Sequence, residues 1–341
     1  MKAIILKAYG EAYTAFEITE TPVPEPSKSQ ILIKSEGFGL NFADVLARKG
    51  MYKPAPKPPC ILGYEVVGKI VKAGSLANDL KEGDRVLAFT RFGAYAEYAI
   101  IEAHAAIKIP ESLTTAKACA LATQYATAYY AAYDLINLFA GQKVLIHAAA
   151  GGVGSALVQL CKLKGCEIFG TVGSEEKKQH ILNQGVDYAI NYLTHDFEKE
   201  IISISGKNSI DVIFDSIGGK AFNKSRALLS PGGKLISYGA AERTDKKWGI
   251  LSTLNLLKNF GIIHPISLIM NSHSFLGVNL LSLADNKPET IARCLKKVME
   301  LYESGAINPE IGAVFNYKEI SRAHHLLETR KTTGKIAVLW D

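Results

Sequence analysis

The chain of 341 residues has few cysteines, and its five are not placed as the cysteines of a metal site or a disulfide framework usually are. No two of them form a C-x-x-C pair, and no cluster of four occurs. The first residues, MKAIILKAYG, lack the pattern of a secretory signal peptide. We therefore expect reduced thiols, a cytoplasmic location and no structural zinc site.

The sequence also lacks an uninterrupted apolar run of the roughly 18 residues that a membrane-spanning helix needs. The nearest approach, residues 248–283, is interrupted by Lys258, Asn259, His264, Pro265 and Asn271. We expect this segment to supply a core element and a lid or subunit contact. An exposed apolar patch that touches a membrane surface is the alternative.

Charge of one sign is only slightly in excess, since 39 Lys and Arg against 33 Asp and Glu give a net charge of +6. The basic residues are scattered in short pairs such as Lys177-Lys178, without the basic face and interleaved aromatics of nucleic-acid-binding proteins. We therefore predict no nucleic-acid partner. A mild affinity for phosphates or anionic surfaces accounts for the excess.

The apolar residues, 48% of the chain, are sufficient for the two cores that a chain of this length usually forms. Before residue 115, strand-like runs such as QILIKSEGFGL and YEVVGKIVKAG alternate with glycine and proline turns, which predicts a small β-barrel. The stretch TTAKACALATQYATAYYAAYDL predicts a helix. The strand-like runs KVLIHAA, CEIFGTVG and DVIFDSIGG then alternate with helical patterns, which predicts a doubly wound parallel sheet.

One glycine cluster, HAAAGGVGSALVQL at residues 147–160, follows the strand-like KVLI and opens a helix. The strict G-x-G-x-x-G is absent; the pattern is Ala148-x-x-Gly151-x-x-Gly154, whose first residue is a small alanine. A dinucleotide pyrophosphate needs a sharp turn off a strand, a bare backbone and a helix N-terminus. The sequence therefore predicts a dinucleotide site here, with a tight turn that holds no ligand as the alternative.

The end of the next strand, GTVGSEEKKQ, indicates which dinucleotide is bound. An NAD site usually has an acidic residue at this point. Here the residues in that turn and the one after it are Gly173, Ser174, Lys177 and Lys178. Together with Tyr192 at the end of the following strand they suit a 2′-phosphate, so we predict NADPH (NADP+). Glu175 and Glu176 leave NAD open, because either could reach a ribose.

Four segments together resemble the zinc-independent quinone oxidoreductases of the medium-chain dehydrogenase/reductase superfamily: GLNFADVLARKGMY, HAAAGGVG, VIFDSIGG and PGGKLISYGA. The first of them, with LATQYATAYYAAYDL, is most similar to the VAT-1-like branch. The resemblance implies an α/β fold. A GroES-like β-barrel domain, residues 1–122 and 269–341, would be interrupted by a Rossmann doubly wound parallel-sheet domain, residues 123–268. It also implies a homodimer.

The resemblance implies cofactor contacts by position. The pyrophosphate would lie against Gly151, Gly152, Val153 and Gly154. The 2′-phosphate would be held beside Gly173 by Ser174, Lys178 and Tyr192. Asn41 and Thr127 would lie by the nicotinamide. The remaining contacts would be Ser216, Tyr238, Gly239, Gly277 and Asn279.

The cysteine and histidine that bind zinc in related dehydrogenases are replaced in this sequence. Gly63-Tyr64-Glu65 stands where those enzymes have Gly-His-Glu, and Asn41-Phe42 stands where they have cysteine. Zinc sites need thiolate and imidazole ligands close together, so we predict no metal. Without a Lewis acid to polarise a carbonyl, the substrate has to be a good hydride acceptor already, such as a quinone or an α,β-unsaturated carbonyl.

Asn41 and Tyr52 are the candidates to hydrogen-bond the oxygen of that acceptor, with water as a sufficient source of the proton. The alternatives are that Asn41 caps backbone groups and that Tyr52 is a loop aromatic. Asp44, Tyr64 and Glu65 are expected to be structural. Two further functions stay open: an NADPH-binding interaction protein at membrane surfaces, as in the VAT-1 branch, and an enoyl-thioester reductase.

Overall fold

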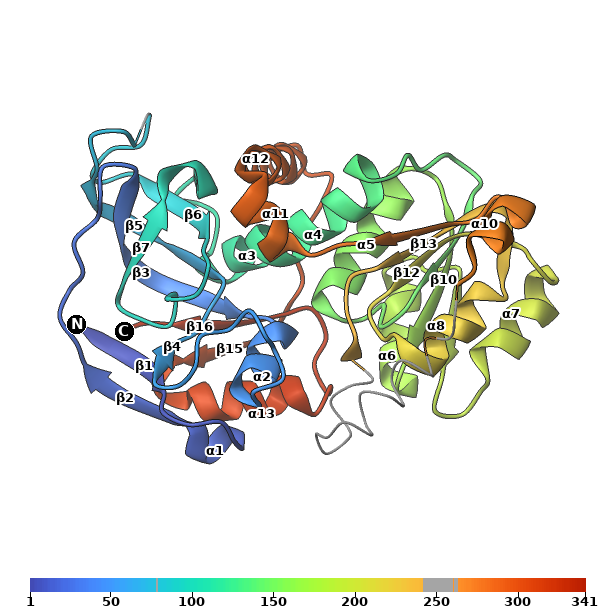
Figure 1. Cartoon of the computed structure of the whole chain (residues 1–341), viewed down its shortest axis with the longest axis horizontal. Helices are drawn as coiled ribbons and strands as arrows, with labels where there is room; N and C mark the ends of the chain where they lie inside the picture. The colour runs from blue at the N-terminus through green and yellow to red at the C-terminus, as the bar shows by residue number, and fades with distance from the viewer. Residues whose placement is uncertain (78, 242–259, 261–262) are drawn as a thin grey trace. The chain divides into compact units, whose positions relative to one another are not determined.

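The computed structural model describes residues 1–77, 79–241, 260 and 263–341, and it divides the chain into two compact units (Figure 1). The first unit comprises Met1–Ala126 and Leu280–Asp341, and the second comprises Thr127–Asn279. The divisions therefore fall later than residues 122 and 268, the boundaries expected from the sequence. The second division is later because a strand at Ser274–Gly277 still belongs to the sheet of the second unit.

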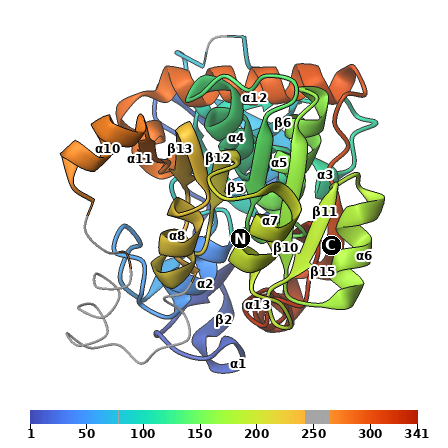
Figure 2. The same cartoon turned by 90° about the vertical axis from the view of Figure 1, so that its right-hand side faces the viewer.

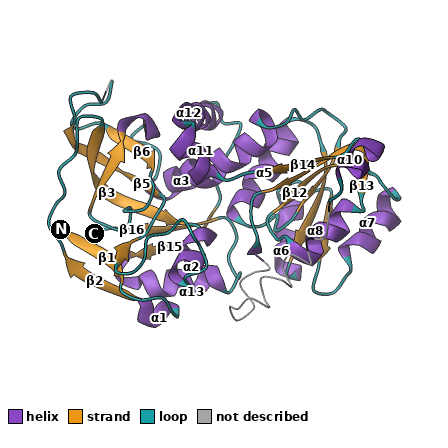
Figure 3. Cartoon of the chain, viewed as in Figure 1, coloured by secondary structure: helices purple, strands orange, loops and turns teal. Residues whose placement is uncertain are grey.

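The first unit is rich in strands, which Figure 3 draws in orange. Its seven-stranded sheet has the order β15-β16-β3-β5-β6-β8, and β7 also pairs with β3. These strands are β3 (Gln30–Leu40), β5 (Glu65–Ala73), β6 (Arg85–Phe89), β7 (Tyr98–Glu102), β8 (Ala106–Lys108), β15 (Ile311–Asn316) and β16 (Lys335–Leu339). A second sheet joins β1 (Lys2–Leu6), β2 (Phe16–Glu20) and β4 (Cys60–Ile61).

The long strand β3 organises this unit, because it pairs with β5, β7 and β16. Its inward side chains Ile31, Ile33 and Phe38 are buried in one core with apolar residues of β5, β6 and β16. Gly68 of β5 permits this close pairing, since a Cβ there would collide with the backbone of Lys34. The β-rich domain that the sequence predicts for this part of the chain is confirmed.

Helices complete the first unit. They are α1 (Ala12–Ala15), α2 (Phe42–Arg48), α3 (Thr115–Ala120), α11 (Leu280–Asn286), α12 (Pro288–Glu303) and α13 (Ile320–Glu328). The alanine-rich helix expected after Thr115 is present but is not uniform. π-helical turns at Leu121–Tyr125 and Tyr130–Asp134 flank α4 (Ala126–Tyr129).

The second unit is a six-stranded parallel sheet with the order β11-β10-β9-β12-β13-β14 (Figure 2). The strands are β9 (Lys143–Ile146), β10 (Glu167–Val172), β11 (Tyr188–Asn191), β12 (Ile210–Asp215), β13 (Leu229–Ser237) and β14 (Ser274–Gly277). The connecting helices are α5 (Gly152–Leu163), α6 (Glu175–Asn183), α7 (Phe197–Ser205) and α8 (Gly219–Arg226).

The strand order reverses direction between β9 and β12. With right-handed crossovers, α5 and α6 therefore cover one face of the sheet, and α7 and α8 cover the other. This is the predicted doubly wound sheet, and the prediction is confirmed. Because the strands are parallel, their carboxyl ends share one edge, and the reversal makes that edge the place where a ligand is expected.

The apolar segment 248–283 is only partly visible, since residues 248–259, 261 and 262 lie outside the described residues. Helix α10 (Pro265–Asn271) exposes Ile266, Ile269 and Met270, with Met270 78% exposed. Strand β14 then joins the sheet, and Leu280 and Leu281 are buried. Among the described residues, no helix is long and apolar enough to cross a membrane.

Candidate active site

The glycine cluster forms a tight turn between β9 and α5. Ala148 has a positive φ of 52°, a conformation uncommon outside glycine. Gly151 is the N-cap residue of α5. A Cβ on Gly154 would collide with the carbonyl oxygen of Ala148 and with Cα of Ala149, so the helix packs directly on the turn. The result is a bare backbone at a helix N-terminus, on the carboxyl edge of the sheet.

This turn fits the pyrophosphate of a dinucleotide. Gly151, Gly152 and Gly154 carry no side chain that could separate phosphate oxygens from backbone amides. The hydroxyl of Ser155 donates inward to the carbonyl oxygen of Gly151 at 3.0 Å, which leaves the helix N-terminus uncovered by that side chain. The positive end of the helix dipole favours an anion at this position.

The residues predicted for the 2′-phosphate meet at the ends of β10 and β11. Ser174 caps α6 by accepting the backbone N–H of Lys177 at 3.2 Å. Tyr192 donates its backbone N–H to the carbonyl oxygen of Val172, and its hydroxyl lies so near Gly173 that a Cβ there would approach it to 2.7 Å. Glycine at residue 173 therefore makes room for the tyrosine hydroxyl beside Ser174.

Glu175, the acidic residue that follows Ser174, already has two partners in the structure. Glu175 accepts a hydrogen bond from Nδ2 of Asn191 at 2.8 Å, and its other oxygen lies 3.7 Å from Nζ of Lys178. The carboxylate is thus held by the end of β11 and by the next turn of its own helix. Lys178 remains about a third exposed. This arrangement suits a phosphate more than a ribose hydroxyl, which would need a free carboxylate.

The other predicted contacts of the second unit follow the carboxyl ends of the remaining strands. Ser216 follows β12, Tyr238 and Gly239 follow β13, and Gly277 ends β14 just before Asn279. A Cβ on Gly239 would lie 2.7 Å from the carbonyl oxygen of Ser216, so these two turns touch. Thr127 is nearly buried in α4, at the start of this unit. The sheet therefore brings most of the predicted cofactor residues to one edge.

Asn41 and Tyr52 belong to the first unit. Asn41 is the N-cap of α2, where its backbone N–H donates to Oδ2 of Asp44 at 2.8 Å. Its side-chain Oδ1 accepts a hydrogen bond from Nζ of Lys335 at 3.0 Å. Lys335 also forms an ion pair with Glu65, and both side chains are fully buried. The capping position considered as the alternative for Asn41 is therefore present, and its carboxamide is in addition held by Lys335.

Aromatic residues surround the Asp44 side of this cluster. The rings of Tyr52 and Tyr64 meet edge to face, with centroids 6.3 Å apart, and Tyr64 packs against Phe92. Burial raises the pKa of Asp44 to about 7, because the fully buried carboxyl is removed from water. Burial likewise raises the pKa of Tyr52. Tyr52 is thus a half-buried residue next to Tyr64, which the family resemblance puts at a zinc-ligand position.

Lys335 is the residue of this cluster that sequence reasoning missed. It lies near the C-terminus, in GKIAVLW, and Asn41 lies near the other end of the chain. A lysine that opens an otherwise apolar strand was the available signal. Its partner could not be deduced, because the contact depends on β16 pairing with β3.

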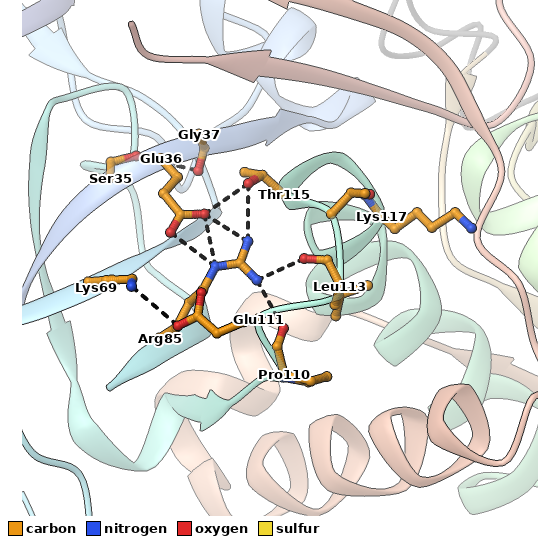
Figure 4. A network of polar contacts seen from close by, with 11 residues as sticks. Ser35, Glu36, Gly37, Lys69, Arg85, Pro110, Glu111, Leu113, Thr115 and Lys117 are labelled. Carbon is orange, nitrogen blue, oxygen red and sulfur yellow. Dashed lines mark hydrogen bonds and ion pairs between the residues drawn. The ribbon is translucent and has the colours of Figure 1, made fainter. Parts of the chain in front are cut away.

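Two other buried polar groups are structural. Arg85 of β6 donates to Glu36, to Thr115 and to the carbonyl oxygens of Pro110 and Leu113, as Figure 4 shows. Every guanidinium donor of Arg85 has an acceptor, so it ties the strands to the start of α3. His147 is similarly held, with Nδ1 3.0 Å from the Thr171 hydroxyl and Nε2 2.7 Å from the Ser225 hydroxyl.

The described part of the chain contains no group of three or more His, Cys, Asp or Glu side chains placed to hold a metal ion. Two protein families match the sequence, the alcohol dehydrogenase GroES-like domain over residues 27–111 and the zinc-binding dehydrogenase domain over residues 152–296. The second name is that of the family. Asn41 and Tyr64, which the family resemblance puts at zinc-ligand positions, lie in the residues matched by the GroES-like domain.

Named relatives cover nearly all of the chain. The synaptic vesicle membrane protein VAT-1 homologue of Danio rerio is 34% identical over 338 residues, which are 98% of this chain and 69% of that protein. The human quinone oxidoreductase is 30% identical over 341 residues, 99% of this chain and 98% of that protein. The chain belongs to the quinone oxidoreductase and VAT-1 family of the medium-chain dehydrogenases/reductases.

Solved structures of this family agree with the fold. Escherichia coli quinone oxidoreductase complexed with NADPH has a TM-score of 0.86 and 27% identity, covering 99% of this chain and all of that one. The mycobacterial protein Rv1454c, also complexed with NADPH, has the same score and identity and covers 99% of each chain. The GroES-like and Rossmann assignments are thereby confirmed, and the family places this chain among the oxidoreductases.

Proposed function

We propose that this chain catalyses the NADPH-dependent, zinc-independent reduction of quinones or α,β-unsaturated carbonyls. The observation that carries the proposal is the arrangement at the ends of β10 and β11. There the Tyr192 hydroxyl lies beside Gly173 and Ser174, and Glu175 is engaged by Asn191. NADPH-bound relatives of the same fold support this choice of cofactor.

The residues of the chain bind the cofactor and orient the acceptor. The turn Gly151–Gly154 holds the pyrophosphate against the start of α5, and Ser174, Lys178 and Tyr192 hold the 2′-phosphate. When bound, NADPH supplies the hydride. Asn41 and Tyr52 hydrogen-bond the carbonyl oxygen of the acceptor, so that negative charge forming on that oxygen is stabilised. One proton from water, or from the Tyr52 hydroxyl resupplied by water, completes the reduction.

Turnover with a panel of acceptors tests the proposal. Loss of reduced nicotinamide is followed by absorbance with an ortho-quinone, a para-quinone, a simple enone and an enoyl thioester. Reduction of a quinone or the enone, faster with NADPH than with NADH, supports the proposal. Reduction of the thioester alone would instead assign the chain to the enoyl-thioester reductases. Tight NADPH binding without reduction of any acceptor would contradict the proposal.

A second candidate function, an NADPH-binding protein at membrane surfaces, is favoured by the exposed apolar side chains of α10. Ile266, Ile269 and Met270 are each more than half exposed. Apolar side chains gathered in this way often mark an interaction surface. Flotation with anionic liposomes, with and without NADPH, distinguishes this candidate. Absence of association in both conditions would exclude it.

A further inference from the structure

We infer that the buried Lys335–Glu65 pair sets the polarity of Asn41, so that Asn41 Nδ2 donates a hydrogen bond to a carbonyl oxygen of the bound ligand. Lys335 and Glu65 are then positioning residues, and Asn41 is the group that touches the ligand. The inference rests on the proposed function, because it specifies how Asn41 takes part in that reaction.

The strand pairing brings these three residues together. β3 pairs with β16 through Leu40 and Ile336, and with β5 through Phe38 and Val66. Asn41 directly follows β3, Lys335 begins β16, and Glu65 begins β5. The three residues are therefore neighbours at one end of three adjacent strands.

Gly39 makes room for the pair. A Cβ at residue 39 would collide with Oε1 of Glu65 and with Cε of Lys335. Gly39 has no positive φ, so the backbone conformation does not require glycine there. The absence of a side chain at residue 39 is explained by the space that the Lys335–Glu65 pair occupies.

The chemistry of an ammonium group fixes which end of the Asn41 amide faces it. Lysine carries three donors and no acceptor, so only the carbonyl Oδ1 can bond to it, as observed at 3.0 Å. Nδ2 must then point away from Lys335. Glu65 supplies the counter-charge that an ammonium group needs in a protein interior. An uncharged residue at position 335 would allow either end of the amide to turn toward it.

Nδ2 of Asn41 is a buried donor without a partner. Asn41 is 8% exposed, and among the described residues no acceptor bonds to Nδ2. A buried donor left unpaired destabilises the fold, so such groups are rare and call for an explanation. A ligand carbonyl provides one. Two carbonyl oxygens are available in the proposed reaction, that of the nicotinamide carboxamide and that of the acceptor.

The test combines Asn41→Ala with a neutral replacement of the pair, Glu65→Gln with Lys335→Met, which leaves no unpaired charge in the core. We expect Asn41→Ala to lower kcat/KM about 100-fold, as loss of a donor to a developing oxyanion does. We expect the pair replacement to lower it about 10-fold, a loss smaller than that from removing the donor itself. If the pair acts through Asn41, kcat/KM of the triple variant is no lower than that of Asn41→Ala alone.

A merely structural pair would give a different pattern. The pair replacement would then lower activity by the same factor whether or not Asn41→Ala is also present, and that result would overturn the inference. Full activity of the pair replacement would overturn it as well. Arg85→Met with Glu36→Gln is the control, because it removes a partly buried ion pair of the same unit that does not contact Asn41. The change that this control makes in the activation free energy should add to the change made by Asn41→Ala.

A thioamide analogue of NADPH separates the two ligand oxygens, because sulfur is a weak acceptor. If Nδ2 bonds the carboxamide, wild-type protein binds NADPH more tightly than the analogue, and the pair replacement loses this preference. If Nδ2 bonds the acceptor, both proteins show the same preference and the pair replacement changes only turnover of the acceptor.

The binding measurement also separates this inference from the proposed function. Wild-type protein that reduces no acceptor would contradict the proposed function alone, because the cycle can still be measured on NADPH affinity. If that affinity were then unchanged by both Asn41→Ala and the pair replacement, the inference would fail too.

Discussion

The hydroxyl of Tyr192 lies beside Gly173 at the point where β10 ends, and a Cβ at residue 173 would approach it to 2.7 Å. The tyrosine follows β11 and the glycine follows β10, so the pairing of two parallel strands brings Tyr192 to the turn in which Ser174 follows Gly173. A hydroxyl group and a small residue at this point leave space for a 2′-phosphate. A carboxylate in the same place would instead bind a ribose hydroxyl.

Replacement of this hydroxyl tests its role in cofactor choice. We expect Tyr192→Phe to raise KM for NADPH about 10-fold, since one hydrogen bond to a charged phosphate is worth about 1.5–3 kcal/mol and part of it is recovered from water. KM for NADH should not change, because NADH has no 2′-phosphate. An equal rise for both cofactors would show that Tyr192 only supports the fold.

Lys178 is predicted to contribute charge to the same phosphate. Lys178→Ala should weaken NADPH binding several-fold, and the loss should shrink as salt is added, since screening reduces the contribution of an exposed charge. Lys199→Ala is the control, because Lys199 is an exposed lysine on α7. Titration of both variants with NADPH at low and high salt checks the prediction. A salt-independent loss would contradict it.

Gly154 is predicted to be irreplaceable. Gly154→Ala places a methyl group against the backbone of Ala148 and Ala149, which cannot move aside as a flexible side chain could. We expect the variant to lose about 2 kcal/mol or more of unfolding free energy and to bind NADPH poorly. Gly232→Ala is a suitable comparison, since glycine 232 has open space around it and its strain comes from a positive φ of 81° alone. Its cofactor affinity should be unchanged, as measured by fluorescence titration.

Asp44 is predicted to weaken the fold at neutral and alkaline pH. Its pKa in the folded protein is about 7 against an ordinary 3.8, so the folded state binds a proton more tightly than the unfolded state. The stability gained from this tighter proton binding is therefore fully present below pH 4 and is lost as the pH rises to about 7. Asp44→Asn should gain stability relative to wild type across that range, as followed by denaturant unfolding. A constant difference from pH 4 to pH 8 would contradict this.

His147 is predicted to change the pH dependence of stability in the opposite direction. Burial lowers its pKa below 6.5, so the folded state resists protonation, and stability falls as the pH decreases below 6.5. Replacement with asparagine should lower stability at pH 8 and should reduce its further fall on acidification. His324, whose pKa is also lowered by burial, remains in the variant and retains part of the acid sensitivity.

The homodimer expected from the family resemblance stays a prediction. In the described part of the chain, β14 pairs with a strand on one side only, and α10 beside it exposes Ile269 and Met270. If this face joins two copies, replacing both residues of α10 with glutamate should convert a dimer to a monomer in light scattering. Phe139→Ser, which removes another exposed apolar side chain of the same unit, should leave the mass unchanged.

Sequence reasoning succeeded where chemistry is local. The turn at Gly151–Gly154 depends on residues a few positions apart, and the alternation of strands and helices predicts the parallel sheet that carries it. It failed where residues distant in the chain meet. Lys335 and Asn41 come into contact only because β16 pairs with β3. A single charged residue in an apolar strand does not show which residue it will contact.

The most direct test of the proposed reduction follows the transferred hydrogen. Wild-type protein is given NADPH deuterated at the transferable position of the nicotinamide, together with an enone, and the product is analysed by NMR. The account predicts one deuterium on the β-carbon of the saturated ketone and a solvent-derived hydrogen on the α-carbon. A saturated product without deuterium would contradict it.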